Sequence, residues 1–198
     1  MNTLPFSQAC ENNKGPICDI LARVLAERHC VLEIGSGTGQ HVTWFARHLP
    51  HLTWQPSDIA ANLPSLLPRC AAYEGDNLLP PLALDVSIRP WDAPAQEDAI
   101  FTANSLHIMP WGSVEDLFAE LADRARSGAL LAIYGPFNYR GQYTSRSNAQ
   151  FDQWLAQQSP HSAIRHFEEV EALARAAGYQ LQEDNAMPAN NRLLVFAR

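Results

Sequence analysis

Residues 31–41, VLEIGSGTGQH, decide the fold. The short apolar run CVLEI at 30–34 ends at a glycine, which is typical of a buried parallel strand, and QHVTWFARHL at 40–49 has helical spacing. Between them stand Gly35, Gly37 and Gly39. Because glycine accepts positive φ and lets a ligand approach the backbone closely, this strand–loop–helix unit predicts a nucleotide-like ligand at the turn.

Other glycine motifs fit this loop less well. In the dinucleotide fingerprint G-x-G-x-x-G the third glycine comes one residue later, where this chain has Gln40. The P-loop fails because no Gly-Lys-Ser/Thr follows. A tight strand–helix turn without any ligand is the simplest alternative interpretation of the loop alone.

The rest of the chain alternates strands with helices. Strands are expected at 30–34, 52–58, 82–88, 97–108 (ending in a loop) and 129–137, and helices at 15–28, 40–49, 113–126, 149–158 and 167–178. YQLQEDNAM and RLLVFAR flank PANN and predict a hairpin. We therefore expect an α/β fold: a Rossmann-like, mostly parallel sheet with a terminal antiparallel hairpin, forming one domain over residues 1–198.

Single residues mark the expected ends of these elements. Pro16 suits the first turn of the first helix, and Pro56 is expected to end the second strand. Ser113 with Asp116 resembles a capping box, and Gly128 follows that helix.

Acidic residues stand at successive strand ends, where open α/β sheets bind their ligands. Asp58 follows the second strand and can accept both hydroxyls of a ribose, and Asp85 near the third can accept from an exocyclic amine. Glu33, just before the glycine loop, can hold the loop or an ammonium group. Each acid alone could be a solvated surface group, but their joint placement favours a ligand site.

The pattern E-x-G-x-G-x-G, an acid after the next strand and a terminal hairpin resembles the class I S-adenosylmethionine-dependent methyltransferases. The resemblance implies a seven-stranded sheet of order 3-2-1-4-5-7-6 and S-adenosyl-L-methionine as cofactor. The cofactor contacts it implies are Glu33, Gly35, Ser36, Gly37, Gly39, Asp58, Ile59, Asp85 and Asn104.

A closer resemblance rests on several motifs spread over the chain. NNKGPI, LEIGSGTGQH, ANSLHIMPW, YGPF, SNAQFD and MPANN together resemble the methyltransferase-like protein 26 family, whose substrate is not settled. This resemblance bears more on the fold than on the chemistry.

His107 and Tyr134 are the candidate catalytic residues, because both follow strands whose ends face the expected site. His107 could be a general base or could only fix its loop, and Tyr134 could equally pack in the core. His41 beside the glycine loop fits a supporting role better. Asparagines at the N-terminal segment, the 138–148 loop and the hairpin are candidate substrate contacts: Asn13, Asn148, Asn190 and Asn191. The 138–148 loop is a candidate lid.

Composition narrows the function classes. The net charge is -7, and the 13 arginines and the single lysine, Lys14, are scattered singly, so no basic stripe predicts nucleic-acid binding. No stretch approaches the roughly 20 apolar residues of a membrane span, and a cytoplasmic protein without signal peptide is expected. The four cysteines and the H-x-x-H at His48 and His51 predict neither disulfides nor a metal site.

The resemblance implies methyl transfer, and the neutral amides of the candidate substrate residues favour a small polar acceptor. The N/D-P-P-Y/F/W motif of many exocyclic-amine methyltransferases is absent, which argues against DNA adenine or glutamine as the acceptor. The alternatives are a non-catalytic S-adenosylmethionine-binding protein and an NAD(P)-dependent oxidoreductase. The early third glycine and the edge hairpin disfavour the oxidoreductase. The acceptor and the oligomeric state are not readable from the sequence.

Overall fold

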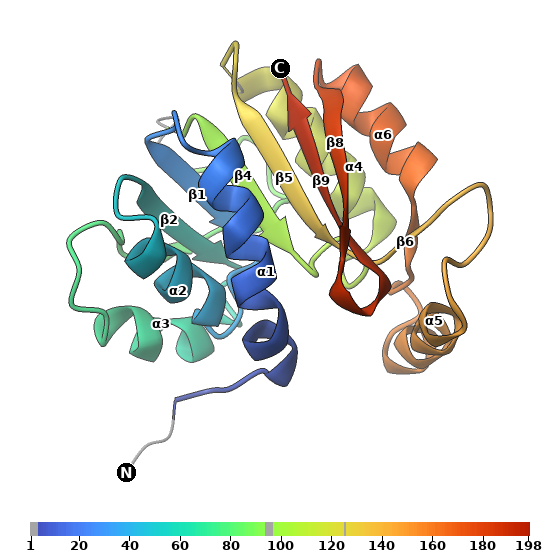
Figure 1. Ribbon diagram of the computed structural model, residues 1–198, viewed down its shortest axis with the longest axis horizontal. Coiled ribbons are helices and arrows are strands. Elements are labelled where there is room, and N and C mark those ends of the chain that lie inside the picture. The colour runs from blue at the N-terminus through green and yellow to red at the C-terminus, as the bar shows by residue number, and fades with distance from the viewer. Residues whose placement is uncertain (1–3, 94–96, 125) are drawn as a thin grey trace. The chain divides into compact units, whose positions relative to one another are not determined.

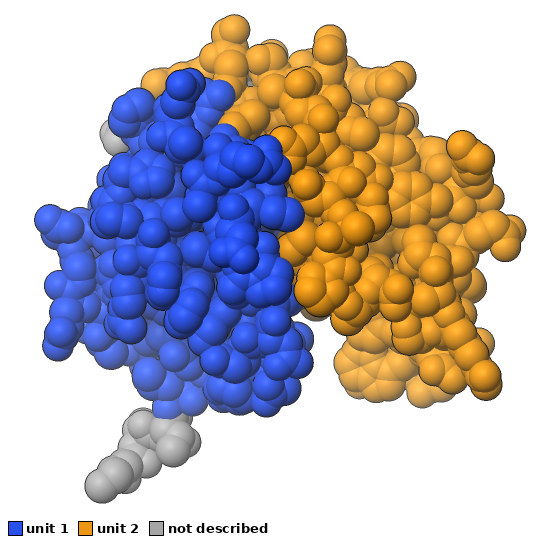
Figure 2. Space-filling model, in the orientation of Figure 1, with its two compact units in different colours: residues 1–85, 92–102 blue, residues 86–91, 103–198 orange. Residues whose placement is uncertain are grey.

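A computed structural model describes residues 4–93, 97–124 and 126–198 (Figure 1). The chain forms two compact units (Figure 2). Unit 1 contains residues 1–85 and 92–102, and unit 2 contains residues 86–91 and 103–198. The expectation of one domain over the whole chain stays a prediction, and the two units are described separately below.

Unit 1 carries the glycine loop. Its elements are α1 (Gln8–Val24), β1 (Cys30–Ile34), α2 (Gln40–His48), β2 (Thr53–Asp58), α3 (Leu63–Ala71), β3 (Leu82–Ala83) and β4 (Ala99–Ala103). β1 is the central strand and pairs in parallel with β2 and β4. The rings of Phe45, Trp54 and Phe101 pack within 5.4–6.4 Å of one another and belong to the buried core of this unit.

Unit 2 ends in the expected antiparallel hairpin. Its elements are α4 (Trp111–Arg124), β5 (Leu130–Gly135), β6 (Phe137–Asn138), α5 (Arg146–Gln158), β7 (Arg165–His166), α6 (Phe167–Ala176), β8 (Gln180–Met187), the 3-10 turn Pro188–Asn190 and β9 (Asn191–Ala197). β9 pairs antiparallel with both β5 and β8. All six residues of β5 are buried, which explains its continuous apolar sequence. The short β6 and β7 form a parallel ladder of their own, which the sequence did not predict.

The strand order is β3-β2-β1-β4-β5-β9-β8. With β8 and β9 as the sixth and seventh strands of the sheet, this is the expected order 3-2-1-4-5-7-6. The fold class predicted from the sequence, a seven-stranded, mostly parallel sheet with an antiparallel hairpin at the end, is therefore confirmed.

Both proline predictions were wrong. α1 begins at Gln8, where the Ser7 hydroxyl accepts from the Cys10 N–H, so Pro16 lies inside the helix instead of in its first turn. β2 continues through Pro56 to Asp58. The neighbouring β3 pairs only with Ser57 and Asp58, so on that side of β2 the missing N–H of Pro56 interrupts no ladder.

Other boundaries also differ from the prediction. α4 begins at Trp111, and the N–H groups of Ser113 and Val114 donate to the Pro110 carbonyl, so Ser113 does not cap this helix. The strand expected over 82–88 ends at Ala83. α3 was not predicted, because its sequence LPSLLPRCA carries two prolines that resemble helix breakers.

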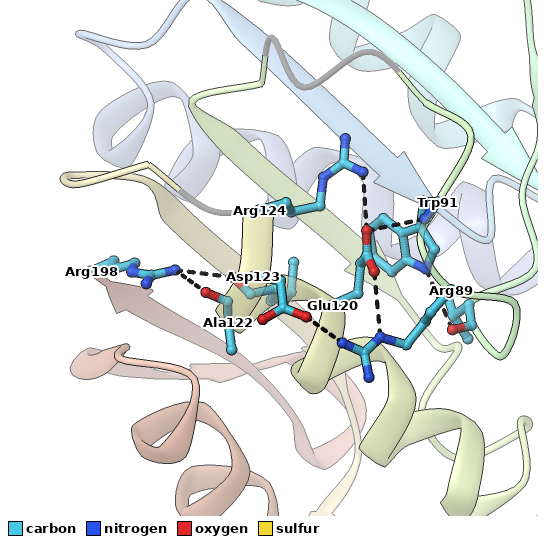
Figure 3. Close-up of polar contacts among 9 residues, drawn as sticks. Arg89, Trp91, Glu120, Ala122, Asp123, Arg124 and Arg198 are labelled. Atoms are coloured by element: carbon cyan, nitrogen blue, oxygen red, sulfur yellow. Dashed lines mark hydrogen bonds and ion pairs between the residues drawn. The ribbon is translucent and has the colours of Figure 1, made fainter.

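A cluster of charged residues fixes the segment 86–91 to α4 (Figure 3). Arg89 contacts Asp123 through Nη2 at 2.6 Å and Glu120 through Nε at 3.4 Å. Glu120 is 4% exposed and also accepts from the Trp91 N–H at 3.0 Å. These contacts explain why 86–91 belongs to unit 2 although the residues on either side of it belong to unit 1. Among the described residues, no helix is long and apolar enough to cross a membrane.

Candidate functional site

The glycine loop has the backbone that only glycine adopts easily. Gly35, Gly37 and Gly39 have φ values of 75°, 56° and 74°. A Cβ on Gly39 would lie 3.0 Å from Leu66 Cδ1, so packing against α3 requires a glycine there. A Cβ on Gly37 would meet nothing within 4 Å. Packing therefore does not explain the bare backbone at Gly37, and the open space above it can admit a ligand.

The end of β2 holds the loop in place. The N–H groups of Gly35 and Ser36 both donate to the Ser57 carbonyl, at 3.0 and 2.9 Å. The Gly37 N–H donates to Asp58 Oδ2 at 2.7 Å. These bonds fix the loop conformation before any ligand binds, which lowers the entropy lost on binding.

The Asp58 carboxylate is buried and oriented. Its Oδ1 accepts from the Ile59 N–H and from Asn62 Nδ2, each at 2.8 Å, while among the described residues Oδ2 accepts only from the Gly37 N–H. A carboxylate oxygen can accept two hydrogen bonds, so Oδ2 keeps one acceptor position. The Leu84 N–H donates to the Asp58 carbonyl at the end of β2, and the exposed Asp85 follows Leu84, two residues beyond the end of β3.

Glu33 of unit 1 is an almost completely buried carboxylate. It is 1% exposed, and its Oε2 has no hydrogen-bond partner among the residues that the structure describes. Burial raises the pKa of Glu33 to about 7; a hydrogen bond with Ser36 opposes this shift, and the charge of Asp58 adds to it. A buried carboxylate oxygen without a partner is costly, and a cationic ligand group would relieve that cost.

Two further residues tie the N-terminal segment to the glycine loop. Arg69 Nε donates to the Thr38 carbonyl at 2.9 Å, and its Nη2 donates to the carbonyl of Pro5. Gln40 accepts from the Ser7 N–H and donates to the Ser7 carbonyl. The sequence does offer a signal for Gln40, since this residue stands where the dinucleotide fingerprint has its third glycine. Arg69 gave no sequence signal, because it reaches the loop only through the fold.

His41 and Asn13 form a buried pair. His41 Nε2 donates to Asn13 Oδ1 at 2.6 Å, and the imidazole stacks on Phe45 with the centroids 5.4 Å apart. Burial and the nearby charge of Lys14 lower the pKa of His41 to about 4, so the ring is neutral at neutral pH. The pair fits the supporting role expected of His41. A substrate contact of Asn13 stays a prediction.

Three of the predicted residues converge at the end of β5 in unit 2. Asn104 has a φ of 59°, and its N–H donates to the Tyr134 carbonyl at 2.8 Å. A Cβ on Gly135 would lie 3.6 Å from His107 Nδ1 and 4.0 Å from Asn104 Oδ1. His107 and Asn104 therefore face the same strand end, next to the buried Tyr134.

His107 is a neutral imidazole in a mostly apolar setting. It is 5% exposed, and its ring packs edge-on against Phe151 at 5.5 Å. Burial lowers its pKa to about 4; the Arg165 charge lowers it further, and Asp152 opposes the shift. At neutral pH the ring can accept a proton or a hydrogen bond, although its low pKa makes it a weak base.

The 138–148 segment is more ordered than the expected long loop. The backbones of Tyr139 and Gln142 exchange hydrogen bonds of 3.0 and 2.9 Å. The two residues between them, Arg140 and Gly141, both have positive φ, which defines a tight type I′ turn. Asn148 belongs to α5. The predicted helix at 149–158 thus began three residues too late, and a lid role for this segment stays a prediction.

Two of the predicted substrate residues are neighbours in unit 2. Asn148 Nδ2 donates to the Asn190 carbonyl at 3.2 Å, and Asn190 Nδ2 donates to Ser147 Oγ at 3.3 Å. Asn191 instead donates to the Pro188 carbonyl within its own turn. In the described part of the chain no group of three or more His, Cys, Asp or Glu residues is placed to hold a metal ion.

A family profile described as "Protein of unknown function (DUF938)" matches residues 4–198. The chain belongs to this family. The family description states no activity, so the chemistry must be argued from the site.

Comparison with solved structures confirms the fold of this chain. An O-methyltransferase family protein from Burkholderia thailandensis is 17% identical, with a TM-score of 0.78 over 93% of this chain and 56% of that one. An O-methyltransferase family 2 protein from Planctomyces limnophilus, in complex with apigenin, is 17% identical, with a TM-score of 0.80 over 96% and 58%. Human N-acetylserotonin methyltransferase in complex with SAM is 12% identical, with a TM-score of 0.74 over 93% and 54%. This chain thus spans little more than half the length of these proteins.

Proposed function

We propose that this protein is an S-adenosyl-L-methionine-dependent methyltransferase. The observation that carries the proposal is the combination, within unit 1, of open space above the positive-φ Gly37 with the unpartnered, buried carboxylate oxygen of Glu33. The space above Gly37 leaves room for a ligand next to a backbone without a side chain. The Glu33 oxygen is an acceptor suited to an ammonium group. The fold shared with solved methyltransferases supports the same activity.

The residues of unit 1 fit the parts of this cofactor. Gly35, Gly37 and Gly39 would leave room for its methionine portion, with Glu33 accepting from its ammonium group. Asp58 would accept from a ribose hydroxyl through the free position on Oδ2, because Gly37 and Asn62 already hold the carboxylate in place. Ser36, Ile59 and Asp85 stand at the same loop and strand ends, where the adenosine would contact them.

The bound cofactor would supply an electrophilic methyl group on a sulfonium. The protein's contribution is then to exclude water, to position the acceptor and, where the nucleophile carries a proton, to remove it. We assign that last task to His107, whose imidazole is neutral and therefore able to accept a proton. Tyr134 and Asn104, beside the same strand end, are candidate orienting groups for it.

We further propose a small polar molecule as acceptor. Asn148 and Asn190 contribute neutral amides to one region of unit 2, and neutral amides suit a small polar ligand. The low lysine content and the net charge of -7 remove the main attraction to nucleic acid. The motif resemblance to the methyltransferase-like protein 26 family is consistent with this choice and does not name the acceptor.

The test has two steps. A thermal-shift screen with S-adenosylmethionine, S-adenosylhomocysteine, NAD and NADP should show stabilisation by the first two only. A ligand at 100 times its dissociation constant adds about 2.7 kcal/mol to the free energy of unfolding. Incubating the protein with methyl-labelled cofactor and a metabolite extract should then label a small molecule. Stabilisation by NAD instead would reject the cofactor, and cofactor binding without any labelled product would favour the non-catalytic alternative.

A further inference from the structure

Unit 2 contains a cavity that the proposed methyl transfer does not use. Its volume is about 430 Å³, within the usual range for small-molecule sites. We call it the Arg165 cavity; its walls include Trp111, Asn138, Tyr143, Asp152, Arg165 and Glu169. They come from the start of α4, from β6 and the turn after it, and from α5, β7 and α6 (Figure 1). The tight turn at Arg140 and Gly141 gives this wall a defined shape.

The guanidinium of Arg165 is a buried cation held by backbone carbonyls. Burial lowers the pKa of Arg165, and the nearby charges of Asp152 and Glu169 oppose this shift. Arg165 is 9% exposed; its Nε donates to the Leu106 carbonyl, and its Nη2 donates to the carbonyls of Met109 and His161. Among the described residues no carboxylate forms an ion pair with it, and Nη1 has no hydrogen-bond partner. A buried guanidinium with free donors favours an anionic group in the adjoining space, and a carboxylate matches its geometry.

Two other side chains of the cavity, Asn138 and Glu169, offer acceptor oxygens. Asn138 is 6% exposed, and its Oδ1 has no partner. Glu169 is exposed and makes no hydrogen bond with the described residues. Asp152 is partly engaged, since its Oδ1 accepts from the Ile164 N–H at 2.6 Å and its Oδ2 accepts from the Tyr143 hydroxyl at 2.7 Å. Glu169 and Asn138 therefore favour a ligand group that donates hydrogen bonds and carries positive charge.

We propose that the Arg165 cavity binds a small zwitterion of the amino-acid type. Its carboxylate would pair with Arg165 Nη1, and its ammonium group would face Glu169 and Asn138. The carboxylates of Asp152 and Glu169 disfavour a phosphate, because its multiple negative charges would be held close to theirs. The aromatic rings of Trp111 and Tyr143 can cover the apolar part of the ligand. This site does not depend on the proposed methyl transfer.

The test is binding of free amino acids to the full-length protein without any cofactor. Saturation-transfer NMR with the proteinogenic L-amino acids at millimolar concentration should identify at least one binder. Analogues of that binder that lack either the amino group or the carboxylate should bind at least about tenfold more weakly, since each loses a charge-assisted hydrogen bond. Inorganic phosphate, as the competing probe, should not displace it.

Glu169→Gln is the main variant, because the side chain is exposed and its replacement leaves the fold intact. It should weaken amino-acid binding about tenfold. Glu171→Gln on the same helix is the matched control and should bind like the parent, since Glu171 pairs with Arg175 and does not line the cavity as far as the described residues show. Arg165→Lys should also weaken binding, provided that circular dichroism shows an unchanged fold. No amino-acid binding, preference for phosphate, or equal binding by Glu169→Gln and the parent would overturn the proposal.

Discussion

Replacing Glu33 by glutamine should stabilise the protein at neutral and alkaline pH. The native state buries this carboxyl group, and its pKa is raised from 4.5 to about 7. Between these two values the unfolded chain releases the proton while the native state keeps it. The native state is therefore penalised as pH rises, up to about 3 kcal/mol above pH 7. Glutamine has nearly the same shape and carries no charge, so the variant escapes this penalty.

The assay is urea unfolding of both proteins at several pH values between 5 and 8.5. Comparing the two proteins cancels the contributions of all other titrating groups. The difference in the free energy of unfolding should shift by about 2–3 kcal/mol in favour of Glu33→Gln as the pH rises over this range. The same variant should bind S-adenosylhomocysteine more weakly, because the glutamine amide oxygen lacks the negative charge that would face the ammonium group. A difference that does not change with pH would show that Glu33 is not a buried, strained carboxylate, and unaltered ligand binding would remove it from the cofactor site.

Three further outcomes follow from the same geometry. Gly39→Ala should destabilise the fold by about 1–3 kcal/mol in urea unfolding, because its Cβ would lie 3.0 Å from an α3 side chain at a positive φ. Asn62→Ala should weaken S-adenosylhomocysteine binding about tenfold with little loss of stability, because Asp58 loses an orienting hydrogen bond. Calorimetry measures the affinity, and an affinity equal to that of the parent would contradict the role of Asp58. The lowered pKa values of His41 and His107 mean that the unfolded chain takes up protons first. Their contribution to stability is thus complete above pH 6.5 and is lost as the pH falls toward 4. In thermal unfolding measured at several pH values, His41→Gln should lose less stability than the parent between pH 6.5 and 4. An equal loss in both proteins would show that the pKa of His41 is not lowered.

The parts of the fold that the sequence predicted correctly are those set by local pattern. The strand at 30–34, the positive φ of the three loop glycines and the final hairpin all follow from residue spacing and glycine placement. The short strands and the proline-containing elements were predicted poorly. The Ser7 cap starts α1 well before Pro16, and β3 pairs only with the residues after Pro56; neither fact is contained in the sequence next to these prolines.

The candidate site divides in the same way. Glu33 and Asp58 were recognisable because they stand at strand ends next to the glycine loop. Arg69, Asn62 and Arg165 were not, because each acts through contacts that depend on the folded chain: Arg69 reaches a carbonyl 31 positions away, and Arg165 reaches one 59 positions away. The raised pKa of Glu33 was equally unreadable, since it results from complete burial.

The central claim is that the open backbone at Gly37 accommodates S-adenosylmethionine. The most direct measurement is calorimetric titration of S-adenosylhomocysteine into the parent protein, Gly37→Ala and Gly128→Ala. Gly128 also has a positive φ and open space at its Cβ, but it lies in unit 2 after α4, so its alanine variant carries the same backbone strain away from the loop. We predict one bound ligand for the parent and for Gly128→Ala, and at least tenfold weaker binding for a folded Gly37→Ala. No binding by the parent at millimolar ligand, or equal binding by both variants, would contradict the claim.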